Sequence, residues 1–134
     1  MSAKPETTFI ASVHKHLPPG RRDPYYFKNN NEYTAGIPDV WYSGQKNDLW
    51  VEYKFLDKIP IKKEFKPALS ELQNIWLDER YAEGRNVAVI IGCKEGGVIL
   101  MGGQWNVPMS NATFKIWVRS RKEIAEWIME QTVK

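Results

Sequence analysis

The 134-residue sequence contains a single cysteine, Cys93, so it cannot form an intramolecular disulfide. This excludes the disulfide-stabilised secreted domains, and we expect Cys93 to be a small buried residue in a reducing compartment. No apolar run approaches the roughly 18 residues that a membrane-spanning helix needs. The first six residues contain no apolar segment of the kind found in secretory signals. These absences predict a cytoplasmic protein, or one in the host cell cytoplasm if the chain is viral.

Charge of one sign is not in large excess either. The 19 Lys and Arg residues against 16 Asp and Glu residues give a net charge of +3, which is too small to indicate nucleic-acid binding by itself. A hydrophobic content of 43% and a charged content of 26% are typical of globular proteins, so neither a disordered nor a fibrous class is indicated. From the length we expect residues 1–134 to form a single domain.

Two segments rich in aromatic and β-branched residues, 36–44 and 49–55, are separated by a polar turn with Gly, Asn and Asp. This pattern predicts a β-hairpin. Because side chains alternate between the two faces of a strand, Glu52 and Lys54 should share one face. Asp39 directly follows a proline, which favours the start or edge of a strand. The hairpin can therefore bring Asp39 close to Glu52.

These three residue types are suited to phosphodiester hydrolysis. Two neighbouring carboxylates repel each other unless they share a proton or bind a cation. Oxygen ligands suit Mg²⁺ and Mn²⁺, which also bind phosphate oxygens, and Lys54 would lie next to that cation. The alternative is that Asp39 caps a turn while Glu52 and Lys54 form an ion pair on a solvated face, which would add little stability.

The order of these residues resembles that of the PD-(D/E)xK nucleases: Pro38-Asp39, a gap of twelve residues, then Glu52-Tyr53-Lys54. Residues 33–39 and 70–76 resemble more narrowly the virus-type replication-repair (VRR-NUC) branch, which includes stand-alone phage nucleases. The similarity extends over roughly residues 6–92. It implies a restriction-endonuclease-like α/β fold, in which a mixed central β-sheet with an αβββαβ core is flanked by helices.

The resemblance also implies a metal site. Asp39, Glu52 and the backbone carbonyl of Tyr53 would hold one or two Mg²⁺ ions, with Mn²⁺ able to substitute. Lys54 would orient or help to deprotonate the attacking water, or neutralise the charge that develops on the phosphate. The metal would activate that water and stabilise the phosphate oxygens.

Two further catalytic candidates are implied by the resemblance. A glutamate on the N-terminal helix faces the metal centre in this family, which makes Glu6 a candidate for catalysis and for binding a second metal or its water. Gln73 corresponds to a glutamine that approaches the attacking water or the scissile phosphate. The residues alone leave ordinary alternatives, since Glu6 is favoured by the helix dipole and Gln73 borders the apolar stripe of its helix.

Basic residues flank the carboxylates in the sequence and could position a polyanionic backbone. In the resembling family, a lysine or asparagine commonly precedes the Gly36-Ile37-Pro38-Asp39 element, and Lys28 has that place. For any single lysine a solvated charged surface is an equal alternative. The candidates for nucleic-acid binding are Arg21, Arg22, Lys28, Lys58, Lys62 and Lys63, with Lys66 in the same cluster.

Together these features predict a Mg²⁺-dependent DNA endonuclease that acts on branched or flap DNA or on specific duplex sites, as a phage-type resolvase or a homing endonuclease. Because one domain offers one active centre, cutting both strands favours a homodimer or a higher homo-oligomer. Two alternatives remain: a non-catalytic nucleic-acid-binding module on the nuclease fold, and a protein-interaction domain, which the Trp and Tyr content permits.

Periodicity predicts the other elements of secondary structure. Helices are expected over residues 5–17, from near Pro67 to Gly84, and after a capping box at Ser120. Strands are expected at 25–27, 86–92, 98–101 and 114–118, with loops at 56–66 and 104–111. The apolar faces would comprise Leu69, Leu72, Ile75 and Trp76 in the second helix, and Ile124, Trp127 and Ile128 in the last.

Overall fold

A mixed β-sheet forms the centre of the computed structural model, which describes residues 4–20, 22–29, 35–61 and 64–134. In these residues the sheet has five strands in the order β1-β2-β3-β4-β5. All neighbours are antiparallel except β3 and β4, which are parallel and are connected through the helix α2. The strands are β1 (Tyr25–Lys28), β2 (Val40–Ser43), β3 (Asp48–Phe55), β4 (Val87–Cys93) and β5 (Gly96–Leu100).

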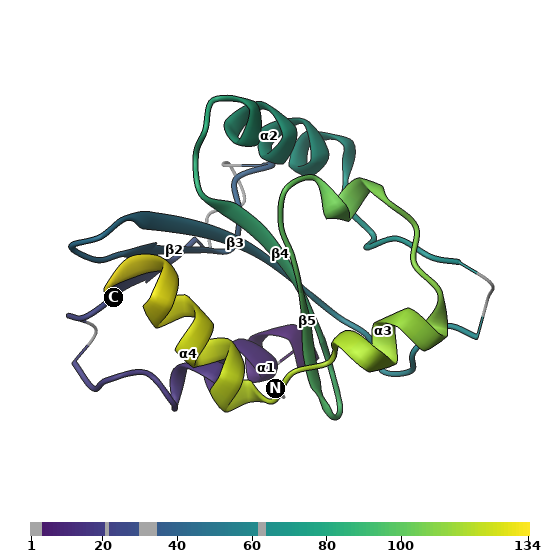
Figure 1. The fold of residues 1–134 in the computed structure, drawn as a ribbon, viewed down its shortest axis with the longest axis horizontal. Coiled ribbons are helices and arrows are strands. Elements are labelled where there is room, and N and C mark those ends of the chain that lie inside the picture. The colour runs from purple at the N-terminus through teal and green to yellow at the C-terminus, as the bar shows by residue number, and fades with distance from the viewer. Residues whose placement is uncertain (1–3, 21, 30–34, 62–63) are drawn as a thin grey trace.

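Helices cover both faces of this sheet (Figure 1). The helices α1 (Pro5–His14) and α4 (Arg121–Thr132) pack on one face. The other face carries α2 (Glu71–Ala82), the 3-10 helix η1 (Gln104–Asn106) and α3 (Asn111–Trp117). Because both faces of β4 are covered, its residues are buried along the whole strand, as the sequence predicts. Cys93 is buried at its end.

The order of elements from α1 to β4 is the predicted αβββαβ core, followed by β5, α3 and α4. No helix in the described ranges is both long enough and apolar enough to cross a lipid bilayer.

The predicted hairpin is formed by β2 and β3, with Val40 opposite Val51. Its first strand begins at Val40 and not at Gly36, because the preceding residues form a loop that approaches α2. Gly36 has a φ of 90°, and a Cβ atom there would lie 2.8 Å from the carbonyl oxygen of Leu72. Only glycine tolerates both this conformation and this close contact. The loop that carries Asp39 is thereby held against the first turn of α2.

The start of α2 differs from the prediction. A capping box at Ser70 begins the helix: the Ser70 hydroxyl accepts the Gln73 N–H at 3.1 Å, and Gln73 Oε1 accepts the Ser70 N–H at 2.9 Å. The predicted apolar stripe is wrong at Leu72 and Ile75, which are exposed, whereas Leu77 is buried. Gln73, three to four residues before the packed Trp76 and Leu77, lies on the helix face that meets the sheet, so positions 72 and 75 point away from it.

In the C-terminal region one predicted element is wrong and another is confirmed. Residues 114–118 are predicted as a strand, but most of them belong to α3, whose first turn is capped by the Ser110 hydroxyl accepting the Thr113 N–H. Alternation of apolar residues was misleading there because Ile116 is exposed. The predicted loop at 104–111 contains η1. The last helix has the predicted capping box and buries the three expected residues, Ile124, Trp127 and Ile128.

Buried polar contacts tie α1 to the hairpin. The hydroxyl groups of Tyr42 and Tyr53 lie 2.6 Å apart, and Nε2 of His14 lies 2.7 Å from the Tyr42 hydroxyl. Both tyrosines are completely buried, so these groups replace water for one another. This series of hydrogen bonds links α1, which carries Glu6, to the strand that carries Glu52.

We expect Tyr42→Phe to lower the free energy of unfolding by about 1–3 kcal/mol, because it removes a partner from the buried Tyr53 hydroxyl and from the half-buried His14 ring. Chemical denaturation measures this loss. The matched control is Tyr81→Phe, since Tyr81 is exposed on α2 and its loss should change stability by no more than about 0.5 kcal/mol. Equal stabilities of the two variants would contradict this account of the Tyr42 contact.

Candidate active site

Two carboxylates from neighbouring chain segments converge at the middle of β3. Asp39, in the loop that enters β2, accepts the backbone N–H of Tyr53 through Oδ2 at 2.9 Å. This bond holds Asp39 next to Glu52, whose pKa responds to the Asp39 charge. The Glu52 side chain is only 2% exposed. Such burial differs from the solvated ion pair that the sequence left open.

Lys54 and Gln73 form a closed set of contacts with Glu52. The Lys54 ammonium lies 3.3 Å from Glu52 Oε2 and donates to Gln73 Oε1 at 3.1 Å. The amide Nε2 of Gln73 donates to the same Glu52 oxygen at 2.9 Å. Since Gln73 Oε1 also accepts the Ser70 N–H, the cap of α2 fixes the orientation of the amide. One glutamine thus positions both the acid and the base of the motif.

Glu6 and Lys28 lie within electrostatic range of this centre. Burial raises the pKa of Glu6, Asp39 raises it further, and Lys54 opposes both effects. Lys28, the last residue of β1, is among the charges that lower the pKa of Asp39. Both residues therefore lie close enough for their charges to act on the carboxylate centre, and their roles stay predictions.

For the other basic residues that are candidates for nucleic-acid binding, the structure describes no contact with the carboxylates. Arg22 and Lys58 are exposed, and no hydrogen bond or ion pair of their side chains is described. Arg21, Lys62 and Lys63 lie outside the described residues. Their contact with nucleic acid stays a prediction.

The carboxylates carry the electrostatic cost of their burial. Removal from water is the largest effect on Glu52; together with the nearby Asp39 charge, it raises the pKa of Glu52 to about 8, although Lys54 acts in the opposite direction. Burial also raises the pKa of Asp39, while the Tyr53 N–H and the Lys54 charge oppose the rise. Without a cation, this centre therefore retains a proton at neutral pH.

The arrangement fits a hard divalent cation. Glu52 Oε1 is buried and has no hydrogen-bond partner among the described residues, and a buried acceptor left in this way is costly. In the described part of the chain no three His, Cys, Asp or Glu side chains converge as a metal cluster. Asp39 and Glu52 would supply two carboxylate ligands, and the remaining positions would be left to water and substrate, as is usual for Mg²⁺.

Neither a protein-family model nor a curated protein matches this sequence. A solved structure does match the fold: Hjc, a Holliday junction resolvase from the archaeal hyperthermophile Archaeoglobus fulgidus. The TM-score is 0.56, and the match covers 92% of this chain and 97% of that chain at 13% sequence identity. The chain has a restriction-endonuclease-like fold. The predicted fold class is confirmed, and the narrower likeness to the VRR-NUC branch stays a prediction.

Ser70 and Gly36 are two contributors that the sequence interpretation missed. Ser70 orients Gln73 through the helix cap, and Gly36 allows the Asp39 loop to touch α2. The spacing Ser70-Glu71-Leu72-Gln73 is a capping-box pattern and could have located both the start of α2 and the fixed glutamine.

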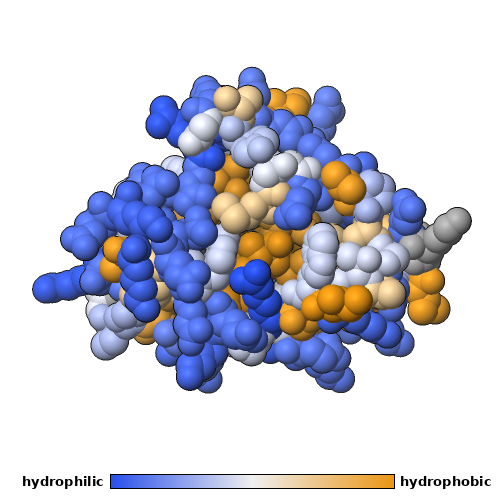
Figure 2. Space-filling model, in the orientation of Figure 1, coloured by the Kyte–Doolittle hydropathy of each residue, from blue (hydrophilic) through white to orange (hydrophobic). Residues whose placement is uncertain are grey.

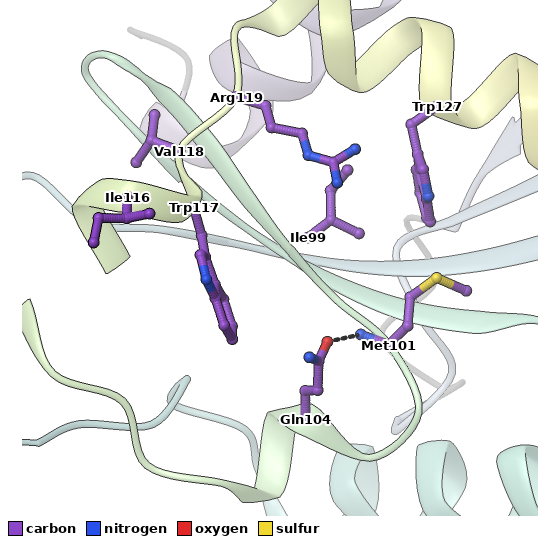
Figure 3. Close-up of a pocket in the computed structure, with 8 residues that line it drawn as sticks. All are labelled: Ile99, Met101, Gln104, Ile116, Trp117, Val118, Arg119 and Trp127. Atoms are coloured by element: carbon purple, nitrogen blue, oxygen red, sulfur yellow. Dashed lines mark hydrogen bonds between the residues drawn. The ribbon is translucent and has the colours of Figure 1, made fainter. Parts of the chain in front are cut away.

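A separate hollow of about 430 Å³ lies at the β5 edge of the sheet (Figure 3). Its lining includes Ile99, Met101, Trp117 and Trp127, and Arg119 projects over it. Figure 2 shows the apolar surface that gathers around the centre of this view. The lining contains no carboxylate, so this hollow is not part of the candidate active site.

The raised pKa of Glu52 predicts a pH dependence of stability in metal-free buffer. The folded state holds this proton more tightly than the unfolded chain, so stability should fall as the pH rises from about 4.5 to about 8. The expected loss is on the order of 5 kcal/mol, because each pKa unit corresponds to about 1.4 kcal/mol. Glu52→Gln should remove most of this slope in denaturation measured across that range. Glu126→Gln, at an exposed carboxylate of α4, should keep the parent's slope, and a parent whose stability rises over this interval would contradict the assignment.

Proposed function

We propose that this chain is a Mg²⁺-dependent DNA endonuclease, with Mn²⁺ able to substitute, that hydrolyses phosphodiester bonds in branched DNA. The observation that carries the proposal is the contact set around Glu52. One carboxylate oxygen is held by Lys54 and Gln73, while the other is buried and accepts no hydrogen bond from a donor group in the described residues. The Glu52 carboxyl lies beside a second acid, Asp39, with which it would share a proton in the metal-free state. A divalent cation would replace that proton and remove the repulsion between two buried carboxylates.

Each residue of the site has a distinct role in this proposal. A divalent cation held by Asp39, Glu52 and the Tyr53 carbonyl would activate water for attack and stabilise charge on the phosphate. The Tyr53 N–H fixes Asp39 and Gln73 holds Glu52 Oε2, which would leave Glu52 Oε1 to bind the cation. Lys54 keeps a positive charge at the rim, where it orients the attacking water or neutralises the phosphate oxygens.

Glu6 and Lys28 complete the proposed centre. Glu6 is half-buried and senses the charges of Asp39 and Lys54, so it would hold a second metal or orient its water. Lys28, whose charge acts on Asp39, would contact a phosphate of the substrate. Exposed Arg22 and Lys58, and Arg21, Lys62 and Lys63, would bind the DNA backbone further away.

Branched DNA is favoured as the substrate because the fold is shared with a protein described as a Holliday junction resolvase. We further propose that the protein acts in the cytoplasm as a single domain. Cutting two strands would require two copies of the centre, so we propose a homodimer or a higher homo-oligomer. Flap cleavage, or a homing-type duplex specificity, would use the same centre.

Cleavage assays with Mg²⁺ on a four-way junction, a flap and a plain duplex test this function. We expect the junction or the flap to be cut faster than the duplex. Asp39→Asn and Lys54→Ala should each reduce the rate at least about 100-fold, since each removes a group that stabilises the transition state. Lys122→Ala, at an exposed lysine of α4, should cut like the parent. Unchanged rates in the Asp39 and Lys54 variants would refute the proposed centre.

Gln73→Glu separates the positioning role of Gln73 from its role in the helix cap. Glutamate keeps the capping box but replaces the amide donor with a third carboxylate next to Glu52. We expect kcat to fall roughly 10- to 100-fold, on the scale of losing a residue that orients a metal ligand. Ser70→Ala keeps the backbone N–H that holds Gln73 Oε1 and loses only the hydroxyl that accepts the Gln73 N–H. It should therefore lower stability by about 1 kcal/mol while kcat stays within about threefold of the parent. The opposite pattern would show that Gln73 acts only through the helix.

A further inference from the structure

A row of aromatic side chains crosses the sheet next to the candidate active site. Phe27, Trp41 and Trp50 are direct partners in the register of β1, β2 and β3. Directly opposite residues of antiparallel strands share a face, so the three rings lie on the same side. The Trp41 and Trp50 ring centres are 6.0 Å apart, and Trp76 of α2 continues the row at 5.4 Å from Trp50.

This aromatic row (Phe27, Trp41, Trp50 and Trp76) lies on the same face of the sheet as the catalytic candidates. Trp50 and Glu52 are two positions apart on β3 and therefore point the same way, roughly 7 Å from one another along the strand. On α2, Gln73 contacts Glu52 while Trp76, one turn later, contacts Trp50. The row and the acidic centre thus run side by side across the same strand and helix.

Between the rings lies a hollow of about 210 Å³, lined by Phe27, Asn29, Ile37, Trp41 and Trp50. This hollow is connected to the active-site loop by the backbone. Ile37 is two residues before Asp39, and the Asn29 N–H donates to the Asp39 carbonyl oxygen at 2.7 Å. An occupant of the hollow would therefore contact the chain segments on either side of the Asp39 loop.

The outer part of the row is not a packed core. Phe27 is 56% exposed and belongs to β1, at the edge of the sheet. The helix that contacts β2, α4, packs on the opposite face. In the described residues, α2 meets the row only at its Trp50 end. The exposed Phe27 ring and the partly exposed Trp41 and Trp50 rings line one hollow and so leave a contiguous apolar surface open beside the carboxylates, which is the kind of surface that marks a binding site.

We propose that the aromatic row is a stacking platform for unpaired bases of the DNA strand whose phosphate is bound at Asp39 and Glu52. This inference rests on the proposed nuclease function and specifies its substrate: DNA with unpaired nucleotides next to the cleavage position, as at a fork or a flap. Aromatic side chains stack on bases of any sequence, because every base presents a π-face. Bases held inside a duplex do not offer that face.

The dimensions agree with this assignment. Successive bases of a stacked strand are about 3.4 Å apart, so the row lies within about two nucleotides of a phosphate at Glu52. The Trp41 and Trp76 rings lie 6.0 and 5.4 Å from the Trp50 ring, and the hollow that Phe27, Trp41 and Trp50 share is of a size that suits a single nucleobase. The platform would hold the unpaired strand in place while the carboxylates act on its backbone.

Binding measured by fluorescence anisotropy in EDTA tests the platform without cleavage. The probes are a forked duplex with unpaired arms and a fully paired duplex of the same length. Phe27→Ala should weaken fork binding roughly 5- to 30-fold, the range expected for the loss of one aromatic stacking contact, and change duplex binding less than about twofold. Phe27→Trp should keep the fork affinity, whereas Phe27→Leu, which preserves apolar bulk without a ring, should lose it.

The matched control is Trp117→Ala, since Trp117 is 41% exposed at the β5 edge, away from the row. It should bind both probes like the parent. A fork with abasic arms removes the bases instead of the ring, so the parent should bind it as weakly as Phe27→Ala binds the intact fork. On the abasic fork, Phe27→Ala and the parent should bind equally. Circular dichroism and denaturation confirm that each variant is folded. Trp41→Phe, which keeps a ring, should retain fork affinity while losing part of the fluorescence quenching by DNA.

Retained fork preference in Phe27→Leu, or equal losses on fork and duplex, would overturn the platform. The platform would also be overturned if Phe27→Ala bound both probes like the parent but sedimented as a different oligomer. That result would assign the row to a contact between protein chains. Failure of the nuclease proposal appears separately, as unaltered cleavage by Asp39→Asn, because the binding experiment contains no metal and measures no cleavage.

Discussion

The site depends on the double hydrogen bond that Gln73 makes across Glu52 and Lys54. An acid and a base two positions apart on an exposed strand would pair loosely through solvent. Here the glutamine holds one carboxylate oxygen, leaves the other without a partner and keeps the ammonium at the rim. Since the cap at Ser70 fixes the glutamine, the beginning of α2 is part of the proposed catalytic arrangement.

Burial gives this arrangement its chemical character. Glu52 and Asp39 are kept from water near each other, and both carboxyl groups are harder to ionise than in solution. A divalent cation would remove that cost by replacing the proton, so the same burial that destabilises the metal-free carboxylates favours metal binding. The fold, shared with a Holliday junction resolvase, places these groups between the strand β3 and the capped end of α2.

Much of this geometry follows from local patterns in the sequence. Strand alternation is sufficient to put Glu52 and Lys54 on one face, and Pro38-Asp39 is sufficient to start the neighbouring strand. The errors have two causes, a tertiary contact and a local helix cap that the interpretation overlooked. Leu72 is exposed because α2 turns Gln73 toward the sheet, and residues 111–117 form a helix because Ser110 caps it. The aromatic row was not foreseen, since it depends on the register that sets Phe27 beside Trp41 and Trp50.

The central claim is that Asp39 and the unpaired oxygen of Glu52 bind a divalent cation. A crystal structure of the protein grown with Mn²⁺ tests it most directly through the anomalous signal of the metal. The account predicts a peak within coordination distance of Glu52 Oε1 and an Asp39 oxygen, with Gln73 still bonded to the other Glu52 oxygen. Glu52 Oε1 bonded to a protein group or water, with no metal peak between the two carboxylates, would contradict it.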